Sequence, residues 1–185
     1  MRDRIIKSAE VRFFRDGYRK VTMDEIASDL GMSKKTLYKY FEGKESIATA
    51  VIEKIHLHIV SFLEEFNRDI PDPIERFEQV SLSVSSKLSE IGNHFLDDIK
   101  RDLPDLWLEV EQFRERKILH HIGEILEEGK SLGKVRANVD TKIATLVYLG
   151  AIKTVMQPDL IKKAGFSIDE AFANIRSIFL KGVVN

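Results

Sequence analysis

Apolar residues recur every three or four positions along most of the chain, the spacing that places them on one face of a helix. No segment between turns shows the alternating pattern of a half-buried strand. The spacing therefore predicts an all-α fold. The expected helices cover residues 3–16, 23–30, 34–41, 44 to before Pro71, Pro73 to Ile91, Asn93 through Ile99, Pro104 to Glu128, 141–156 and 168–182.

The stretch 22–45 contains two short predicted helices joined by a tight turn. Thr22 and Glu25 have the spacing of a capping box, which predicts a helix that begins directly after Thr22. Gly31 ends this helix, because glycine takes the left-handed conformation without steric cost. Ser33 can then cap the second helix. This order of helix, glycine turn and helix is typical of a helix-turn-helix.

The second of these helices keeps its apolar positions, Leu37 and Phe41, on one side. Its outward side carries lysines, a threonine and two tyrosines, which suit DNA because lysines neutralise phosphates and hydroxyls hydrogen-bond them. The alternative is an ordinary solvated helix face. We expect DNA contacts from Thr22, Ser33, Lys34, Lys35, Thr36, Tyr38, Tyr40 and Lys44, the last binding phosphate at the start of the long helix.

The same stretch resembles the DNA-binding signature of the TetR/AcrR family of bacterial transcriptional regulators. The resemblance is carried by Ile26-Ala27, Gly31, Ser33-Lys34, Thr36-Leu37-Tyr38, Tyr40-Phe41 and Lys44-Glu45. Lys35 departs from the pattern, since many members have glycine there. The resemblance covers about the first quarter of the chain and implies a three-helix DNA-binding head, a helical ligand-binding and dimerisation body, and a dimer bundle formed by the last two helices.

The charges are unevenly distributed along the chain. The whole chain has a net charge of -1, but residues 1–46 hold 11 Lys+Arg and 8 Asp+Glu, whereas residues 47–185 hold 18 and 22. A basic head on an acidic body confines phosphate attraction to one end. We therefore expect a DNA-binding domain over 1–46, joined by a long helix to a ligand-binding and dimerisation domain over 47–185.

The composition also indicates the compartment. The chain has no cysteine, which excludes disulfides and thiolate metal sites. The N-terminus lacks an apolar signal-peptide region, and no run approaches the ~18 apolar residues of a membrane span. We expect a cytoplasmic protein with no membrane partner.

Four aromatic residues of the body, Phe77, Phe95, Trp107 and Phe113, stand at helical spacing. They are either plain core or the lining of a largely apolar ligand cavity, with His94, Gln112 or Tyr148 as polar groups. The apolar stripes of the last two helices could pair internally or across a two-fold axis. We expect a homodimer interface built from Ile143, Leu146, Val147, Gly150, Ile168, Phe172, Ile175 and Phe179.

The sequence contains no motif typical of a metal site or of an enzyme active site. His56 and His58 point apart on a helix, and so do the adjacent His120 and His121, so we expect no metal site. Neither a phosphate loop nor a nucleophile elbow occurs. Asp97-Asp98 reads as a solvated pair rather than an acid/base pair. We therefore expect neither a cofactor nor enzymatic activity.

The sequence thus predicts a homodimeric DNA-binding regulator, most simply a repressor that a small, largely apolar ligand releases from a palindromic operator. One alternative is a DNA-binding or architectural protein that needs no ligand. The other is an all-α protein-interaction module with a vestigial helix-turn-helix. Tight, sequence-specific DNA binding would separate the first reading from the last.

Overall fold

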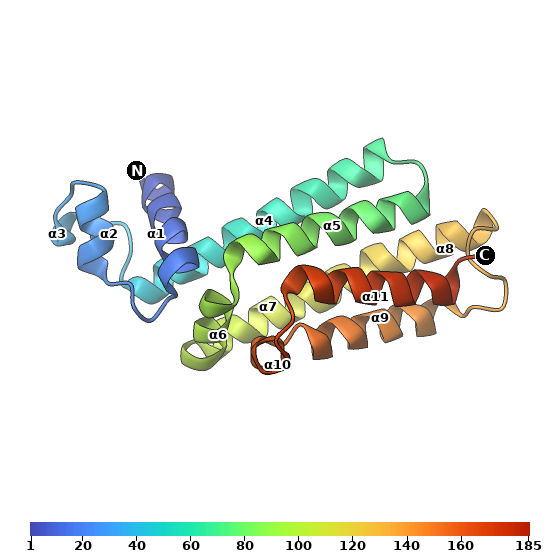
Figure 1. Cartoon of the computed structure of the whole chain (residues 1–185). Helices are drawn as coiled ribbons and strands as arrows, with labels where there is room; N and C mark the ends of the chain where they lie inside the picture. The colour runs from blue at the N-terminus through green and yellow to red at the C-terminus, as the bar shows by residue number, and fades with distance from the viewer. The chain divides into compact units, whose positions relative to one another are not determined.

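The computed structural model describes all 185 residues and confirms the all-α fold. A single bridge between Val135 and Val184 is the only strand-like pairing. The helices are α1 (Arg2–Asp16), α2 (Met23–Asp29), α3 (Lys34–Leu37), α4 (Lys44–Asp69), α5 (Pro73–Ile91), α6 (Asn93–Asp102), α7 (Pro104–Lys117), the π-helical segment η1 (Ile118–Ile122), α8 (Gly123–Ser131), α9 (Thr141–Val155), α10 (Pro158–Ala164) and α11 (Ile168–Val183) (Figure 1).

The chain forms two compact units, and each is made of two separate stretches of the sequence. The first comprises residues 1–58 and 90–110, and the second comprises residues 59–89 and 111–185. The first unit therefore holds α6 as well as the three-helix head, and α4 begins in it and continues into the second. The boundary expected between residues 46 and 47 thus differs from this division.

The first unit is built on α1, whose apolar stripe is buried as its spacing predicts. Ile5, Ala9 and Phe13 have no exposed surface. The ring of Phe13 stacks on that of Phe95 in α6, with 5.6 Å between their centroids. This contact joins residues more than eighty positions apart, so helix periodicity alone does not reveal it.

Helix α4 is long and apolar enough, by length and composition, to cross a membrane, contrary to the sequence-based expectation. Its most apolar 18-residue window has a mean hydropathy of 1.4, and 44% of that window is buried within the protein. Ala48, Val51 and Ile55 lie in the core. Packing of these side chains in the core accounts for part of the apolar composition.

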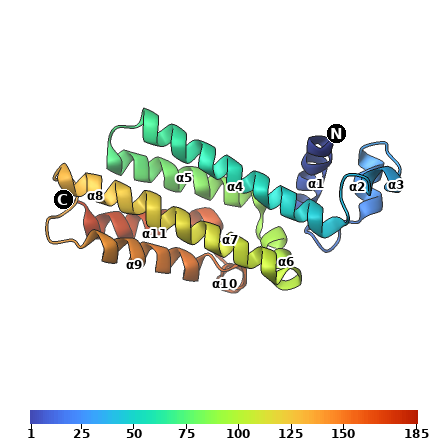
Figure 2. The same cartoon turned by 180° about the vertical axis from the view of Figure 1, so that it is seen from behind.

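In the second unit α9 lies beside both α8 and α11, and their shared core includes several aromatic rings (Figures 1 and 2). Phe77 of α5 contacts Tyr148 of α9 and Phe179 of α11, at centroid distances of 5.2 and 5.4 Å. The α11 stripe of Ile168, Phe172, Ile175 and Phe179 belongs to the same buried cluster. These four side chains therefore need no partner chain to cover them, and the argument that placed them in a dimer interface fails.

Two elements were not anticipated. Helix α10 has only seven residues, which is too short for a periodic pattern. It begins with Pro158 and is followed by Gly165 in the left-handed conformation. The π-helical η1 interrupts what the spacing predicted as one α-helix. The C-terminus lies beside the connection between α8 and α9 (Figure 2), where the Arg136 amide donates to the Val183 carbonyl at 2.9 Å.

Candidate nucleic-acid interface

Helix α2 begins with the predicted capping box. The Thr22 hydroxyl accepts from the Glu25 amide at 3.3 Å, and the Thr22 amide donates to the Glu25 carboxylate at 2.8 Å. These bonds hold the pKa of Glu25 below its usual range, the backbone amide of Thr22 being the main cause. The reciprocal bonds satisfy two amides that a helix start leaves without partners.

The turn after α2 follows the predicted chemistry. Gly31 adopts a φ of 62°, a left-handed conformation that costs glycine little. Ser33 then caps α3, since its hydroxyl accepts from the Thr36 amide at 3.1 Å. The chain thereby reverses within a few residues and presents α3 next to α2.

Helix α3 is shorter than predicted, because it ends at Leu37 rather than Phe41. The amides of Lys39 and Tyr40 bond to carbonyls three residues back rather than four, which tightens the backbone into a turn. Leu37 and Phe41 are nonetheless buried, as their spacing predicted. Their burial in the core holds the segment in place.

The outward face of this segment is open to solvent. Tyr38 and Tyr40 keep 47% and 42% of their surface exposed. Lys34 and Lys35 are exposed, and Thr36 is half-buried, with its hydroxyl 2.9 Å from that of Ser33. The structure thus brings five predicted DNA contacts onto one short segment. Phosphate and base edges could reach all five.

Lys34 already has a partner within the protein. Its ammonium donates to the Asp24 carboxylate of α2 at 2.8 Å, and this bond raises the pKa of Lys34. Both side chains are largely exposed. An exposed ion pair of this kind is weak, so a DNA phosphate or base can replace Asp24 as the partner of Lys34.

Lys44 lies in a different setting from the one expected. Its ammonium donates to the carbonyl oxygens of Tyr18 and Val21, each at 2.9 Å, and stands 4.3 Å from the centre of the Tyr18 ring. A third, longer contact of 3.4 Å reaches the Arg19 carbonyl. Burial lowers the pKa of Lys44. The ammonium thus has partners within the protein, in the loop before α2, and the phosphate contact expected of Lys44 stays a prediction.

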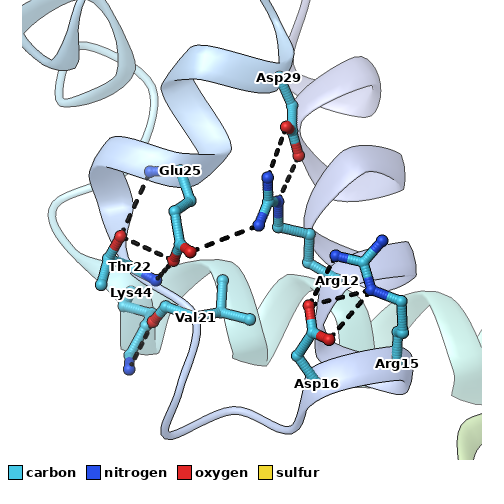
Figure 3. Close-up of polar contacts among 8 residues, drawn as sticks. All are labelled: Arg12, Arg15, Asp16, Val21, Thr22, Glu25, Asp29 and Lys44. Atoms are coloured by element: carbon cyan, nitrogen blue, oxygen red, sulfur yellow. Dashed lines mark hydrogen bonds and ion pairs between the residues drawn. The ribbon is translucent and has the colours of Figure 1, made fainter.

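Arg12 fastens α1 to α2 (Figure 3). Its guanidinium makes a two-bond pair with the Asp29 carboxylate, one bond being 2.6 Å long, and lies 3.5 Å from Glu25. The hydrogen bond from Arg12 lowers the pKa of Asp29. A paired guanidinium and carboxylate have fixed geometry, so the orientation of α2 on α1 is set at this point.

A second fastening joins the loop after α1 to α6. The Arg19 amide donates to the Asp98 carboxylate at 2.9 Å, and the Arg19 guanidinium lies 3.1 Å from Asp102. Gly17 makes this approach possible, because a side chain there would meet Asp98 at 2.8 Å. Asp98 is therefore a structural acceptor and not a solvated carboxylate. The sequence gives no local sign of these contacts, which span 79 residues.

The four aromatic residues proposed for a ligand cavity lie in different surroundings. Phe77 and Phe95 are 1% and 0% exposed and fill the cores of separate units, which is the plain-core alternative that the sequence left open. Trp107 and Phe113 are half-buried. A groove of about 620 Å³ is present elsewhere, lined by Leu119, His120, Gly123, Glu124, Glu127, Thr141, Lys142, Thr145 and Leu146.

The predicted dimer residues of α9 form an apolar face on the surface. Ile143, Leu146 and Val147 are between 57% and 61% exposed, and Gly150 is exposed on the same side. On the neighbouring α11, Ile178 is 73% exposed. Large apolar side chains at this exposure on adjacent helices are typical of a protein contact surface.

Comparison with known proteins places this site in context. Residues 5–51 match the family described as bacterial regulatory proteins, tetR family. The HTH-type transcriptional regulator YvaF of Bacillus subtilis is 25% identical over 88% of this chain and 85% of its own. A transcriptional regulator from Cytophaga hutchinsonii has the same fold, with a TM-score of 0.81, 22% identity and coverage of 98% and 97%. SmeT, the repressor of a multidrug efflux pump of Stenotrophomonas maltophilia, was solved in complex with triclosan and gives a TM-score of 0.73 at 20% identity over 100% and 91% of the two chains.

Proposed function

Because the chain belongs to the TetR/AcrR family of bacterial transcriptional regulators, we propose that it is a cytoplasmic homodimeric repressor that a small, largely apolar molecule releases from a palindromic operator. The observation that carries this proposal is the exposed face of Lys34, Lys35, Tyr38 and Tyr40 above the buried anchors Leu37 and Phe41. A rigid segment with basic and phenolic side chains outward fits the major groove.

Within this face the side chains have separate tasks. Lys34 and Thr36 stand in the first turns after the Ser33 cap, from which a recognition helix reaches base edges. Lys35, Tyr38 and Tyr40 supply phosphate contacts that fix the register on the duplex. Thr22 and Ser33 cap the two helices, so in the proposal they hold the backbone of the DNA-binding segment in place.

The proposed dimer uses the exposed α9 face. Ile143, Leu146 and Val147 recur at the spacing of one helix face and have no cover within the chain. A second copy would bury the same patch symmetrically, as two-fold interfaces do. Two heads held in this way can enter successive major grooves only if their centres lie about 34–36 Å apart or a multiple of that distance.

The proposed effector acts through this spacing. The complex of SmeT with triclosan supports a small-molecule effector for a protein of this fold. In the proposal, the molecule binds the body near Phe113 and favours an arrangement in which the two heads no longer fit one operator. Linkage requires that operator DNA weaken effector binding by the same factor by which the effector weakens operator binding.

Selection of bound duplexes from a random library tests the DNA-binding part of this function. The expected consensus is an inverted repeat whose half-sites are one helical turn or a multiple apart, and footprinting should protect both halves. A protein that recovers no consensus yet binds all duplexes would be an architectural binder. A protein that retains no duplex would be an interaction module with a vestigial helix-turn-helix.

A further inference from the structure

Helix η1 is an unusual element at the junction of α7 and α8. Its five residues, Ile118–Ile122, have π-helical hydrogen bonding within an otherwise α-helical stretch. Short π-helical turns are rare and often occur at functional sites, because the wider turn re-aims the side chains around it. Here the wider turn contains two adjacent histidines.

The π-helical turn bears on the two adjacent histidines, which an α-helix would separate, whereas His120 and Glu124, four residues apart, share a face of an α-helix as well. Successive residues are rotated by about 80° in a π-helix rather than about 100°. The rings of His120 and His121 have centroids only 4.7 Å apart, and His120 Nδ1 lies 3.5 Å from the Glu124 carboxylate. The ligating atoms of all three residues lie within 4.8 Å of one another. The expectation that adjacent histidines diverge therefore does not hold here.

Two imidazole nitrogens and one carboxylate oxygen form a donor set that suits Zn²⁺, Ni²⁺, Co²⁺ or Cu²⁺ better than Mg²⁺ or Ca²⁺. Zinc bonds of about 2.0–2.2 Å place the ligand atoms roughly 3–4 Å apart. His120 and Glu124 are 62% and 54% exposed, so small rotations of their side chains can close the present separation. His121, half-buried, supplies the more fixed position.

We propose that His120, His121 and Glu124 bind a divalent transition-metal ion, with zinc as the expected occupant. Three protein ligands leave at least one coordination position for water. His120 and Glu124 also line the groove, together with Thr141 and Leu146 of α9. The ion would thus bridge η1 to α8 and lie at the edge of the exposed apolar face. This site does not depend on the proposed repressor function.

Zinc binding to the full-length protein, freed of any histidine tag, tests the proposal. Competition with a chromophoric chelator should give one ion per chain. His120→Gln and Glu124→Gln should each weaken binding at least about tenfold, the change expected when a ligand is lost. His58→Gln, which replaces an exposed histidine of α4, is the matched control and should leave the affinity unchanged. Added Co²⁺ should produce visible absorption bands that both site variants lose.

A loss of zinc binding in these variants can be distinguished from misfolding. His120 and Glu124 are exposed, so their glutamine variants should retain the circular dichroism spectrum and thermal midpoint of the metal-free parent. The proposal is overturned if the parent binds no stoichiometric zinc. It is equally overturned if a variant lacking both His120 and Glu124 binds as tightly as the parent, or if His58→Gln loses as much affinity as His120→Gln.

Discussion

The ammonium of Lys44 lies 2.9 Å from the carbonyl oxygen of Val21 and donates a second bond of the same length to the Tyr18 carbonyl. It therefore pins the loop that precedes α2 to the first turn of α4. A lysine in this position stabilises the head of the protein, and through it the orientation of the DNA-binding segment.

Lys44→Ala should therefore destabilise the protein by about 1–3 kcal/mol, since it leaves partly buried carbonyls without their charged donor. Thermal unfolding measures this loss, and Lys35→Ala, at an exposed position, should leave the midpoint nearly unchanged. The salt dependence of operator binding should keep its slope in Lys44→Ala. A stable variant whose slope falls by about 1 would show instead that Lys44 binds phosphate.

Acid should loosen the joint between α1 and α2. Arg12 lowers the pKa of Asp29, and the Thr22 amide lowers the pKa of Glu25. Both carboxylates therefore stabilise the folded protein at pH values above their unfolded pKa values, which are about 3.9 for Asp and 4.3 for Glu. This contribution is lost as the pH falls through the lowered folded-state values. In thermal scans at pH 7 and pH 3, Asp29→Asn should show a smaller acid-induced drop than the parent. Equal drops would contradict the role assigned to the Arg12 pair.

Gly17 and Gly31 both have a positive φ, but only Gly17 also lies close to another side chain. Gly17 has φ 84° and ψ 159°, a region that other residues avoid, and a side chain there meets Asp98. Gly31 has φ 62° and open space around it. Gly17→Ala should cost about 1–3 kcal/mol or more, and Gly31→Ala less, about 1 kcal/mol. Denaturant unfolding of both variants checks the order, and a reversed order would show that α6 does not approach Gly17 this closely.

Val147→Glu should separate the proposed dimer into folded monomers. Val147 is 60% exposed within the chain, so a carboxylate there is solvated in the monomer and buried only by a partner. Light scattering should report the monomer mass, with an unchanged circular dichroism spectrum. Ile175→Glu is the contrast, because Ile175 lies in the core of the chain itself and a charge there should unfold it. A Val147→Glu protein that remained a dimer would place the interface elsewhere.

Local signals explain what the sequence could predict. The cap of Thr22 and Glu25, the turn at Gly31 and the cap of Ser33 each involve residues at most three positions apart, so their types and spacing were sufficient. The buried anchors Leu37 and Phe41 follow from helical periodicity in the same way. These features determine the candidate DNA-binding segment almost completely.

Contacts between distant segments account for the remainder. The carbonyl partners of Lys44 are 23 to 26 residues away, and Asp98 meets Arg19 across 79 residues, with no sequence pattern to relate them. An apolar stripe such as that of α11 has the same appearance whether it faces its own core or a partner chain. The π-helical turn at His120 has no known local signature, and it changes which side chains meet.

The central claim is that the α3 segment reads DNA sequence. It is tested by the ratio of two affinities, that for the selected operator and that for a random duplex. Both are measured at physiological salt for the parent and for Lys34→Ala. The parent should prefer its operator at least about 10³-fold. Lys34→Ala should reduce this ratio about tenfold or more while binding random duplex almost as before, because a base contact is worth about 1–3 kcal/mol of discrimination. An unchanged ratio and unchanged affinity would contradict the assignment of α3 as the recognition element.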